Sequence, residues 1–171
     1  MITFVSKAKI INYFCFTSNN LIYFKIQIST SAMEKTFRCD CPVTSALDIL
    51  GDKWSLVIIK QMLMEGMKTF KDFSESDEAI ASNILSARLK MLEQFQIVRK
   101  EKLPHNKKTN IYVLTERGLA LAPTIIELAL WSHKNVGSYH SIAMSEDQFR
   151  SIEEDKTGFI KLLVDSYMEK N

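Results

Sequence analysis

Two cysteines stand directly before a segment with the pattern of a helix. Cys39 and Cys41 precede Pro42, which suits the first turn of a helix because its missing N–H group is not needed there. The N-terminus of a helix stabilises a thiolate and lowers the pKa of the thiol, which raises its reactivity. Cys41 is therefore a candidate reactive thiol, with the alternative that it is a small residue packed in an interface.

The other chemistry-bearing residues do not favour metal binding or catalysis. Structural zinc usually needs four ligands at recognisable spacing, and the three histidines, His105, His133 and His140, are scattered along the chain. The sequence has no Gly-rich phosphate loop, no nucleophile elbow and no HExxH motif. We therefore expect no metal site, no cofactor and no enzymatic activity.

A second group of polar residues lies on a segment with strong helical periodicity. Leu85, Leu89 and Leu92 recur at intervals of four and three residues, which predicts the buried seam of a helix with Ser82 as its N-cap. The residues that project away from this seam are mostly small, polar or basic: Asn83, Ser86, Ala87, Lys90 and, late in the helix, Glu93. A helix with such an outer face fits the major groove of DNA, where base edges display a unique pattern of donors and acceptors.

Separate roles are predicted for the residues of this helix. Asn83 and Ser86 are expected to read bases, whereas Arg88 and Lys90 are expected to reach phosphates. Base contacts specify the sequence and phosphate contacts position the protein, so the two pairs should respond differently to mutation.

A β-hairpin with a charged tip is predicted to follow the helix. Its strands are expected at residues 97–103 and 111–114, separated by a polar turn at 104–110. Lysines of this turn are placed to contact the neighbouring DNA backbone or minor groove. The full set of predicted DNA-contacting residues is Lys53, Ser82, Asn83, Ser86, Ala87, Arg88, Lys90, Asn106, Lys107 and Lys108.

The charge of the chain is segregated along the sequence. The 22 basic and 20 acidic residues give a net charge of only +2, but residues 82–136 alone carry +5. Residues 33–81 and residues 137–171 each carry −3. Seven basic and two acidic residues fall between Ser82 and Lys108, so much of the positive charge lies on the predicted binding face. The alternative is a solvated basic surface on an ordinary helix.

Composition limits the fold and the compartment. The 171 residues, 46% apolar and 25% charged, suffice for one globular domain with a hydrophobic core. Five Gly and three Pro are too few for an all-β fold with many tight turns. Three cysteines cannot form a disulfide framework and their odd number favours a reducing compartment, so we expect a cytoplasmic protein.

The order of the predicted elements indicates the fold class. Helix, helix, short helix, recognition-type helix and two-stranded hairpin is the order of a winged helix-turn-helix. We therefore predict a mainly α fold with a small β-hairpin. The first helix is expected to begin after Cys41 and end at Gly51, and the second to run from Trp54 to Gly66. A short helix covers Thr69–Phe73, and the recognition-type helix begins at Ser82. A long helix extends from Thr115 through Trp131, and two short helices follow near residues 145–154 and 158–168.

Four motifs in this order resemble the HxlR-type winged-helix transcriptional regulators over roughly residues 39–135. They are Cys41-Pro42-Val43 leading to Ala46-Leu47 and Leu50-Gly51-Asp52-Lys53-Trp54; the segment from Ile80 to Glu93; Tyr112-Val113-Leu114-Thr115-Glu116-Arg117-Gly118; and Leu130-Trp131. The resemblance implies a homodimeric, sequence-specific DNA-binding regulator, with helical dimerisation elements from the first helix and from the long helix after the wing. Some regulators that resemble this family sense oxidants or electrophiles through a cysteine at the place of Cys41, by an intersubunit disulfide or by S-alkylation.

Two departures from the family pattern concern the turns. The turn after the recognition helix usually carries Gly near Gln96, where a positive φ is easiest for glycine. The wing has Lys108-Thr109-Asn110 where the family usually has a proline before the second strand. Both departures affect which wing residue touches DNA rather than the fold.

The first 32 residues differ from the rest of the chain. Eighteen of them are Ile, Asn, Phe, Lys or Tyr, and none is acidic. Their apolar runs are too interrupted for a secretory signal and too short for a membrane span. We expect residues 1–32 to be either translated AT-rich upstream DNA, with Met33 as the true start, or a disordered extension that orders on contact. Residues 33–136 are then the DNA-binding domain and residues 137–171 an acidic helical extension.

The sequence thus predicts a DNA-binding transcriptional regulator that acts as a homodimer on a pseudo-palindromic operator, with Cys41 as a candidate sensor of oxidants or electrophiles. Its predicted partners are double-stranded DNA, a second copy of the chain and an unidentified small-molecule or oxidant effector, with no membrane partner. The alternative function is a winged-helix module that binds protein and leaves the polar face of the recognition helix without nucleic acid.

Overall fold

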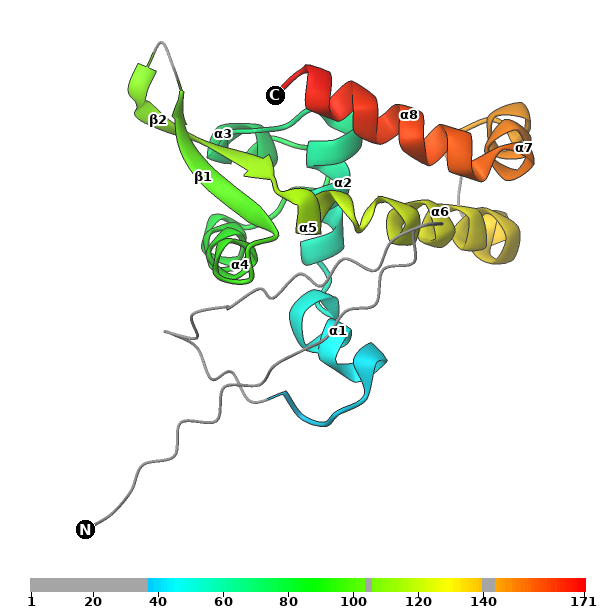
Figure 1. The fold of residues 1–171 in the computed structure, drawn as a ribbon, viewed down its shortest axis with the longest axis horizontal. Helices are drawn as coiled ribbons and strands as arrows, with labels where there is room; N and C mark the ends of the chain where they lie inside the picture. The colour runs from blue at the N-terminus through cyan, green and yellow to red at the C-terminus, as the bar shows by residue number, and fades with distance from the viewer. Residues whose placement is uncertain (1–36, 104–105, 140–143) are drawn as a thin grey trace, which may run out of the picture. The chain divides into compact units, whose positions relative to one another are not determined.

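A computed structural model describes residues 37–103, 106–139 and 144–171. Contacts divide the chain into two units, Met1–Phe37 and Arg38–Asn171, and the elements below all belong to the second unit. The predictions made for the N-terminal extension lie outside the described residues. In the described part the chain forms eight α-helices and one antiparallel hairpin, which confirms the predicted mainly helical fold with a small wing (Figure 1).

The second helix supplies the centre of the hydrophobic core. Helix α1 (Pro42–Leu50) has no buried residue, whereas α2 (Ser55–Glu65) is buried along most of its length. Ile58, Ile59 and Met62 of α2 are completely inaccessible to solvent. The helix ends at Gly66, whose left-handed φ of 71° is readily adopted only by glycine.

A short helix and a loop lead from α2 to α4 (Ser82–Gln94). Helix α3 (Phe70–Ser74) is capped by Thr69 in a capping box with Asp72. Helix α4 follows, but the prediction of Ser82 as its N-cap is wrong. Ala81 holds the N-cap position and Ser82 is the first helical residue, because burial of Ile80 just ahead sets where the chain enters the helix. The Ser82 side chain is consequently left exposed.

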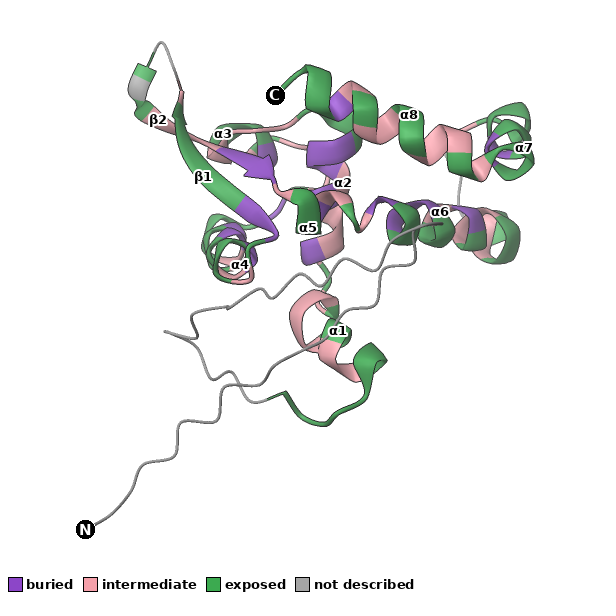
Figure 2. Cartoon of the chain, viewed as in Figure 1, coloured by how far each residue is buried: buried purple, intermediate pink, exposed green. Residues whose placement is uncertain are grey.

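The wing is a two-stranded antiparallel hairpin, β1 (Val98–Leu103) and β2 (Asn106–Leu114). The second strand begins five residues earlier than predicted, because pairing continues past Lys102↔Asn110 through a bulge between Lys102 and Leu103. Burial is confined to the base of the hairpin, where the strands meet the helices, and the described residues beyond the base are exposed or half-buried (Figure 2).

The prediction of one uninterrupted helix from Thr115 through Trp131 is wrong. The structure has a short helix α5 (Glu116–Leu119) capped by Thr115, and then α6 (Ala122–Val136). Pro123 explains the break, because proline cannot donate the backbone hydrogen bond that a continuous helix requires and suits a first turn instead.

The predicted tail helices are confirmed and form a second, smaller cluster. After a 3-10 turn (Gly137–Tyr139), α7 (Glu146–Glu154) and α8 (Lys156–Glu169) return along the domain. Phe149 and Ile152 of α7 pack against Ile126 and Leu130 of α6, while α8 packs against both this cluster and the main core. No helix among the described residues has the length and apolar character needed to cross a membrane.

The turn between α4 and the wing adopts the conformation that the family pattern suggested, without the glycine. Gln96 has a left-handed φ of 57°, and the backbone N–H groups of Gln96 and Ile97 donate to the carbonyl oxygens of Glu93 and Leu92. This is a Schellman motif, in which a non-glycine residue is strained by contact of its Cβ with the backbone.

Replacing Gln96 with Gly should relieve this strain. We expect Gln96→Gly to raise the free energy of unfolding by about 0.5–1 kcal/mol. Glycine removes the cost of the left-handed conformation, and the added flexibility that glycine gives the unfolded chain offsets only part of this gain. Urea denaturation measures the change. The matched control Gln94→Gly, at the last helical position of α4, should give no such gain in stability, because Gln94 is not in a left-handed conformation. A destabilised Gln96→Gly variant would contradict the strain argument.

Candidate nucleic-acid interface

The outer face of α4 is determined by the face that it buries. Leu85, Leu89 and Leu92 are almost completely buried in the main core. Because 3.6 residues complete one helical turn, the positions opposite this seam must face solvent. The residues of α4 that were predicted to contact DNA, Arg88 apart, are exposed: Ser82, Asn83, Ser86, Ala87 and Lys90. Exposure leaves them free to contact DNA, and the contact itself stays a prediction.

Arg88 differs from its neighbours on α4. Its Nε lies 3.3 Å from Oδ1 of Asp52, and its side chain is only 34% exposed. The contact is an ion pair rather than a hydrogen bond, because Nε–H has no aligned acceptor. The guanidinium also lies 3.6 Å from the sulfur of Met91. A phosphate contact by Arg88 stays a prediction, and its side chain is already engaged by Asp52 in this structure.

Asp52 organises the junction between α1 and α2. Its Oδ1 accepts hydrogen bonds from the backbone N–H groups of Trp54 (2.8 Å) and Ser55 (3.1 Å), and its Oδ2 accepts from the Ser55 hydroxyl. One carboxylate therefore satisfies the start of α2 and holds Arg88 of α4. Asp52 belongs to the Leu50–Trp54 motif, for which no role of this residue was predicted, although Gly-Asp before a helix is a recognisable capping signal.

Lys53 lies beside this junction. Its Nζ is 4.6 Å from the centre of the Trp54 ring, a cation–π distance, and the residue is exposed. The aromatic ring thus restrains a lysine that was predicted to contact DNA.

A partly buried polar cluster fixes the segment that leads into α4. Gln61 of α2 is fully buried and donates from Nε2 to Oε2 of Glu78 at 2.6 Å, and Lys60 donates to the other oxygen of Glu78. Burial alone would raise the pKa of Glu78, but the hydrogen bonds from Lys60, a backbone N–H and Gln61, together with the charge of Lys60, outweigh it and hold this pKa below its usual value. The carboxylate therefore stays charged near neutral pH and ties residues 75–81 to α2.

The tip of the wing is shaped by Asn106. Its Oδ1 accepts from the backbone N–H of Lys108 at 3.1 Å, and its Nδ2 donates to the Thr109 hydroxyl at 3.1 Å. Lys108 is exposed, as a phosphate-binding lysine must be. The side chain of Lys107 and the whole of His105 lie outside what the structure describes. Asn106 is thus engaged within the tip and supports the position of Lys108.

The candidate thiol is open to solvent. Cys41 occupies the N-cap position of α1, and both Cys41 and Cys39 are exposed and unpaired with another cysteine. Hydrogen bonds from the backbone and then the hydroxyl of Thr44, together with the backbone of Val43, lower the pKa of the Cys41 thiol below its usual value. The exposed position does not fit burial within this protomer. Among the described residues, no three His, Cys, Asp or Glu side chains gather where a metal ion could be held.

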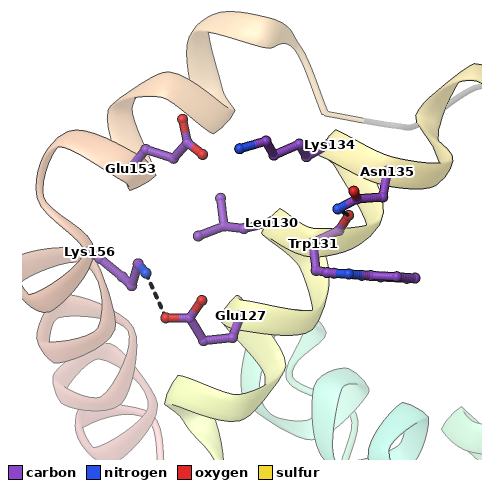
Figure 3. A pocket seen from close by; sticks show the side chains of 7 residues that line it. All are labelled: Glu127, Leu130, Trp131, Lys134, Asn135, Glu153 and Lys156. Carbon is purple, nitrogen blue, oxygen red and sulfur yellow. Dashed lines mark hydrogen bonds and ion pairs between the residues drawn. The ribbon is translucent and has the colours of Figure 1, made fainter.

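An open hollow of about 550 Å3 lies where α6 faces α7 and the start of α8 (Figure 3). Its lining combines apolar Leu130 and Trp131 with an ion pair between Glu127 and Lys156, whose Oε1 and Nζ are 2.6 Å apart. The hollow marks the boundary on α6 between the face covered by the C-terminal helices and the face that remains exposed.

Comparison with known proteins identifies this arrangement. A model of the HxlR-like helix-turn-helix family matches residues 49–140, more than half of the chain, from the end of α1 to just beyond α6. The chain belongs to the HxlR-like helix-turn-helix family. This confirms the resemblance carried by the four motifs. The family consists of DNA-binding transcriptional regulators rather than enzymes, so this HxlR-like chain is a transcriptional regulator.

Three known proteins illustrate the HxlR relationship. The HTH-type transcriptional regulator YodB of Bacillus subtilis is 41% identical over 93 residues, which cover 54% of this chain and 82% of that protein. The structure of PA1607 matches with a TM-score of 0.55 at 29% identity, covering 64% of this chain and 72% of that one. The oxidised redox regulator HypR matches with a TM-score of 0.50 at 32% identity, covering 56% of this chain and 97% of that one.

Salt dependence separates Arg88 from a lysine that is free to bind phosphate. We expect Lys90→Ala to reduce the slope of log Kd against log salt concentration by about 1, because one fewer counterion is released per lost phosphate contact. Arg88→Met should weaken binding with little change in that slope, because its side chain is held by Asp52. Equilibrium binding to DNA upstream of the protein's own coding sequence gives both slopes. Equal reductions in the two variants would show that Arg88 does bind phosphate.

Proposed function

We propose that the protein is a homodimeric cytoplasmic regulator of transcription. Its α4 reads a pseudo-palindromic operator, and its wing contacts the DNA and stabilises the complex. The polar, exposed face of α4, held outward by a fully buried leucine seam, is the observation that supports this proposal most strongly. Asn83 and Ser86 then read base edges, and Lys53, Lys90, Lys107 and Lys108 contact the DNA backbone. Residues 33–136 form the DNA-binding domain and residues 137–171 an extension of it.

Exposed apolar side chains support the dimer. Val43 and Leu47 on α1 are 67% and 53% exposed, and Leu128 and Trp131 on α6 are 47% and 58% exposed. Large apolar residues gathered on two helices of a soluble regulator are typical of a protein interface. A second copy of the chain covers them in our proposal, and its two-fold symmetry places two α4 helices about 34–36 Å apart on successive turns of DNA.

The thiol of Cys41 supplies the proposed signal input. HypR, a redox regulator, is 32% identical to this chain, and Cys41 has the exposure and lowered pKa that favour a reactive thiolate. An oxidant of the disulfide or peroxide class would accept two electrons from the Cys41 thiolates of two subunits as the S–S bond forms. An electrophile would instead accept the thiolate electron pair in a new S–C bond.

DNA recognition is tested by a gel shift on DNA upstream of the protein's own coding sequence, across a salt series. We expect binding that weakens steeply as salt rises, because counterions are released. Asn83→Ala should change the preference between bases, with a loss of about 1–3 kcal/mol at the position it reads. Lys53→Ala is the control for a contact without base preference. A protein that stays unbound at about 50 mM salt would favour the protein-interaction module instead.

Thiol sensing is tested with diamide. We expect oxidation to change operator affinity at least severalfold in the wild type and not in Cys41→Ser, whereas Cys39→Ser should respond like the wild type. Because the pKa of the Cys41 thiol is lowered, the rate of its alkylation should fall as pH decreases, with a midpoint below that of an ordinary cysteine. Unchanged affinity after complete oxidation would refute a sensing role for Cys41.

A further inference from the structure

The outer edge of strand β2 is covered by residues distant in sequence. The backbone N–H of Leu114 donates to the hydroxyl oxygen of Tyr167 in α8 at 2.8 Å, in a buried contact. The N–H of Tyr112 donates to the carbonyl oxygen of Lys68 at 2.7 Å. Strand β2 has β1 on its other side only, so these two donors would otherwise lie on an unpaired strand edge.

Lys68 connects the same edge to the end of α8. While its carbonyl oxygen accepts from Tyr112, its Nζ donates to the carbonyl oxygen of Lys170 at 3.0 Å. The neighbouring Thr69 forms an isolated bridge with Ile111 of β2. The loop between α2 and α3 and the last turn of α8 thus meet at one place beside the wing, as the course of α8 in Figure 1 shows.

Tyr167 is well placed to hold this edge rigidly. Its side chain is 5% exposed and belongs to the main core. Burial raises the pKa of its hydroxyl, so the group is neutral at physiological pH and accepts the hydrogen bond without carrying a charge. The beginning of α8 is anchored separately, since Phe159 packs in the cluster formed by α6 and α7.

We propose that α8 is a strut that positions the wing for DNA binding, with Tyr167 and Lys68 as positioning residues. The strand that α8 holds at Leu114 carries Asn106 and Lys108 at its other end, so movement at the held end changes where Lys108 lies. The family match ends at residue 140, before α8 begins, so this support comes from outside the matched region. The inference rests on the proposed contact of the wing with DNA.

The experiment is a double-mutant cycle in the full chain, with Kd for upstream DNA as the readout. Lys108→Ala should weaken binding roughly threefold to tenfold through loss of a phosphate contact. Tyr167→Phe fills the same space but removes the acceptor of the Leu114 N–H, and should weaken binding about threefold to fivefold. If α8 acts through the wing, Tyr167→Phe should have little further effect in the Lys108→Ala background. Lys68→Met, which removes the tether to Lys170, should behave in the same way.

Hydrogen exchange and a matched control separate positioning from general destabilisation. Tyr167→Phe should accelerate exchange of the Leu114 amide while leaving the amides of α4 protected. Leu162→Ala, on the exposed side of α8, should leave Kd and exchange unchanged. If Lys108→Ala binds DNA as tightly as the wild type, the wing contact fails, and the strut with it. Two outcomes would overturn only the strut, provided that Lys108→Ala weakens binding. In the first, Tyr167→Phe and Lys68→Met have no effect on Kd. In the second, each changes Kd by the same factor in the wild type and in the Lys108→Ala background.

Discussion

Burial of the leucine seam of α4 is the constraint on which the rest of the interface depends. Leu85, Leu89 and Leu92 each gain about 1.5–3 kcal/mol from leaving water, whereas a partly exposed ion pair such as Asp52–Arg88 contributes about 1 kcal/mol or less. The apolar seam therefore sets the rotation of α4 about its axis. Polar contacts adjust that orientation within narrow limits, and the outward direction of Asn83 follows from packing alone.

Asp52 joins three features that the sequence keeps apart. It lies directly after Gly51, where α1 ends, its oxygens satisfy the first turn of α2, and its charge holds Arg88 of the recognition helix. The helix that begins beside Cys41 thus ends one residue from a carboxylate in contact with α4. A change in the position of α1 has a short physical route to α4, through one side chain rather than through the whole core.

Local periodicity predicted the elements whose stability is local in origin. The seam of α4, the capping of α3 and α5 by threonines, and the tail helices all follow from residues within a few positions of one another. The break at Pro123 was also readable, because proline at the second position of α6 restarts a helix. The helical pattern of the apolar residues on either side concealed it.

The features that could not be predicted depend on contacts between distant residues. Arg88 was expected to reach phosphate, and nothing near it in sequence indicates the acid that holds it, because Asp52 lies outside α4. The early start of β2 depends on a shift in its register with β1 after Lys102↔Asn110, and Tyr167 bonds to a residue 53 positions away. Periodicity shows which face of an element is buried, but it does not show which polar group of another element contacts that element.

The covered edge of β2 also bears on how these molecules behave at high concentration. An exposed strand at the edge of a sheet has unpaired backbone N–H and C=O groups, which can pair with a strand of another molecule. This pairing is a common origin of edge-to-edge aggregation. Here the donors of Tyr112 and Leu114 already have acceptors within the same chain. A strand from a neighbouring molecule finds no free donor at these two positions, so this edge of β2 resists sheet extension at the base of the wing.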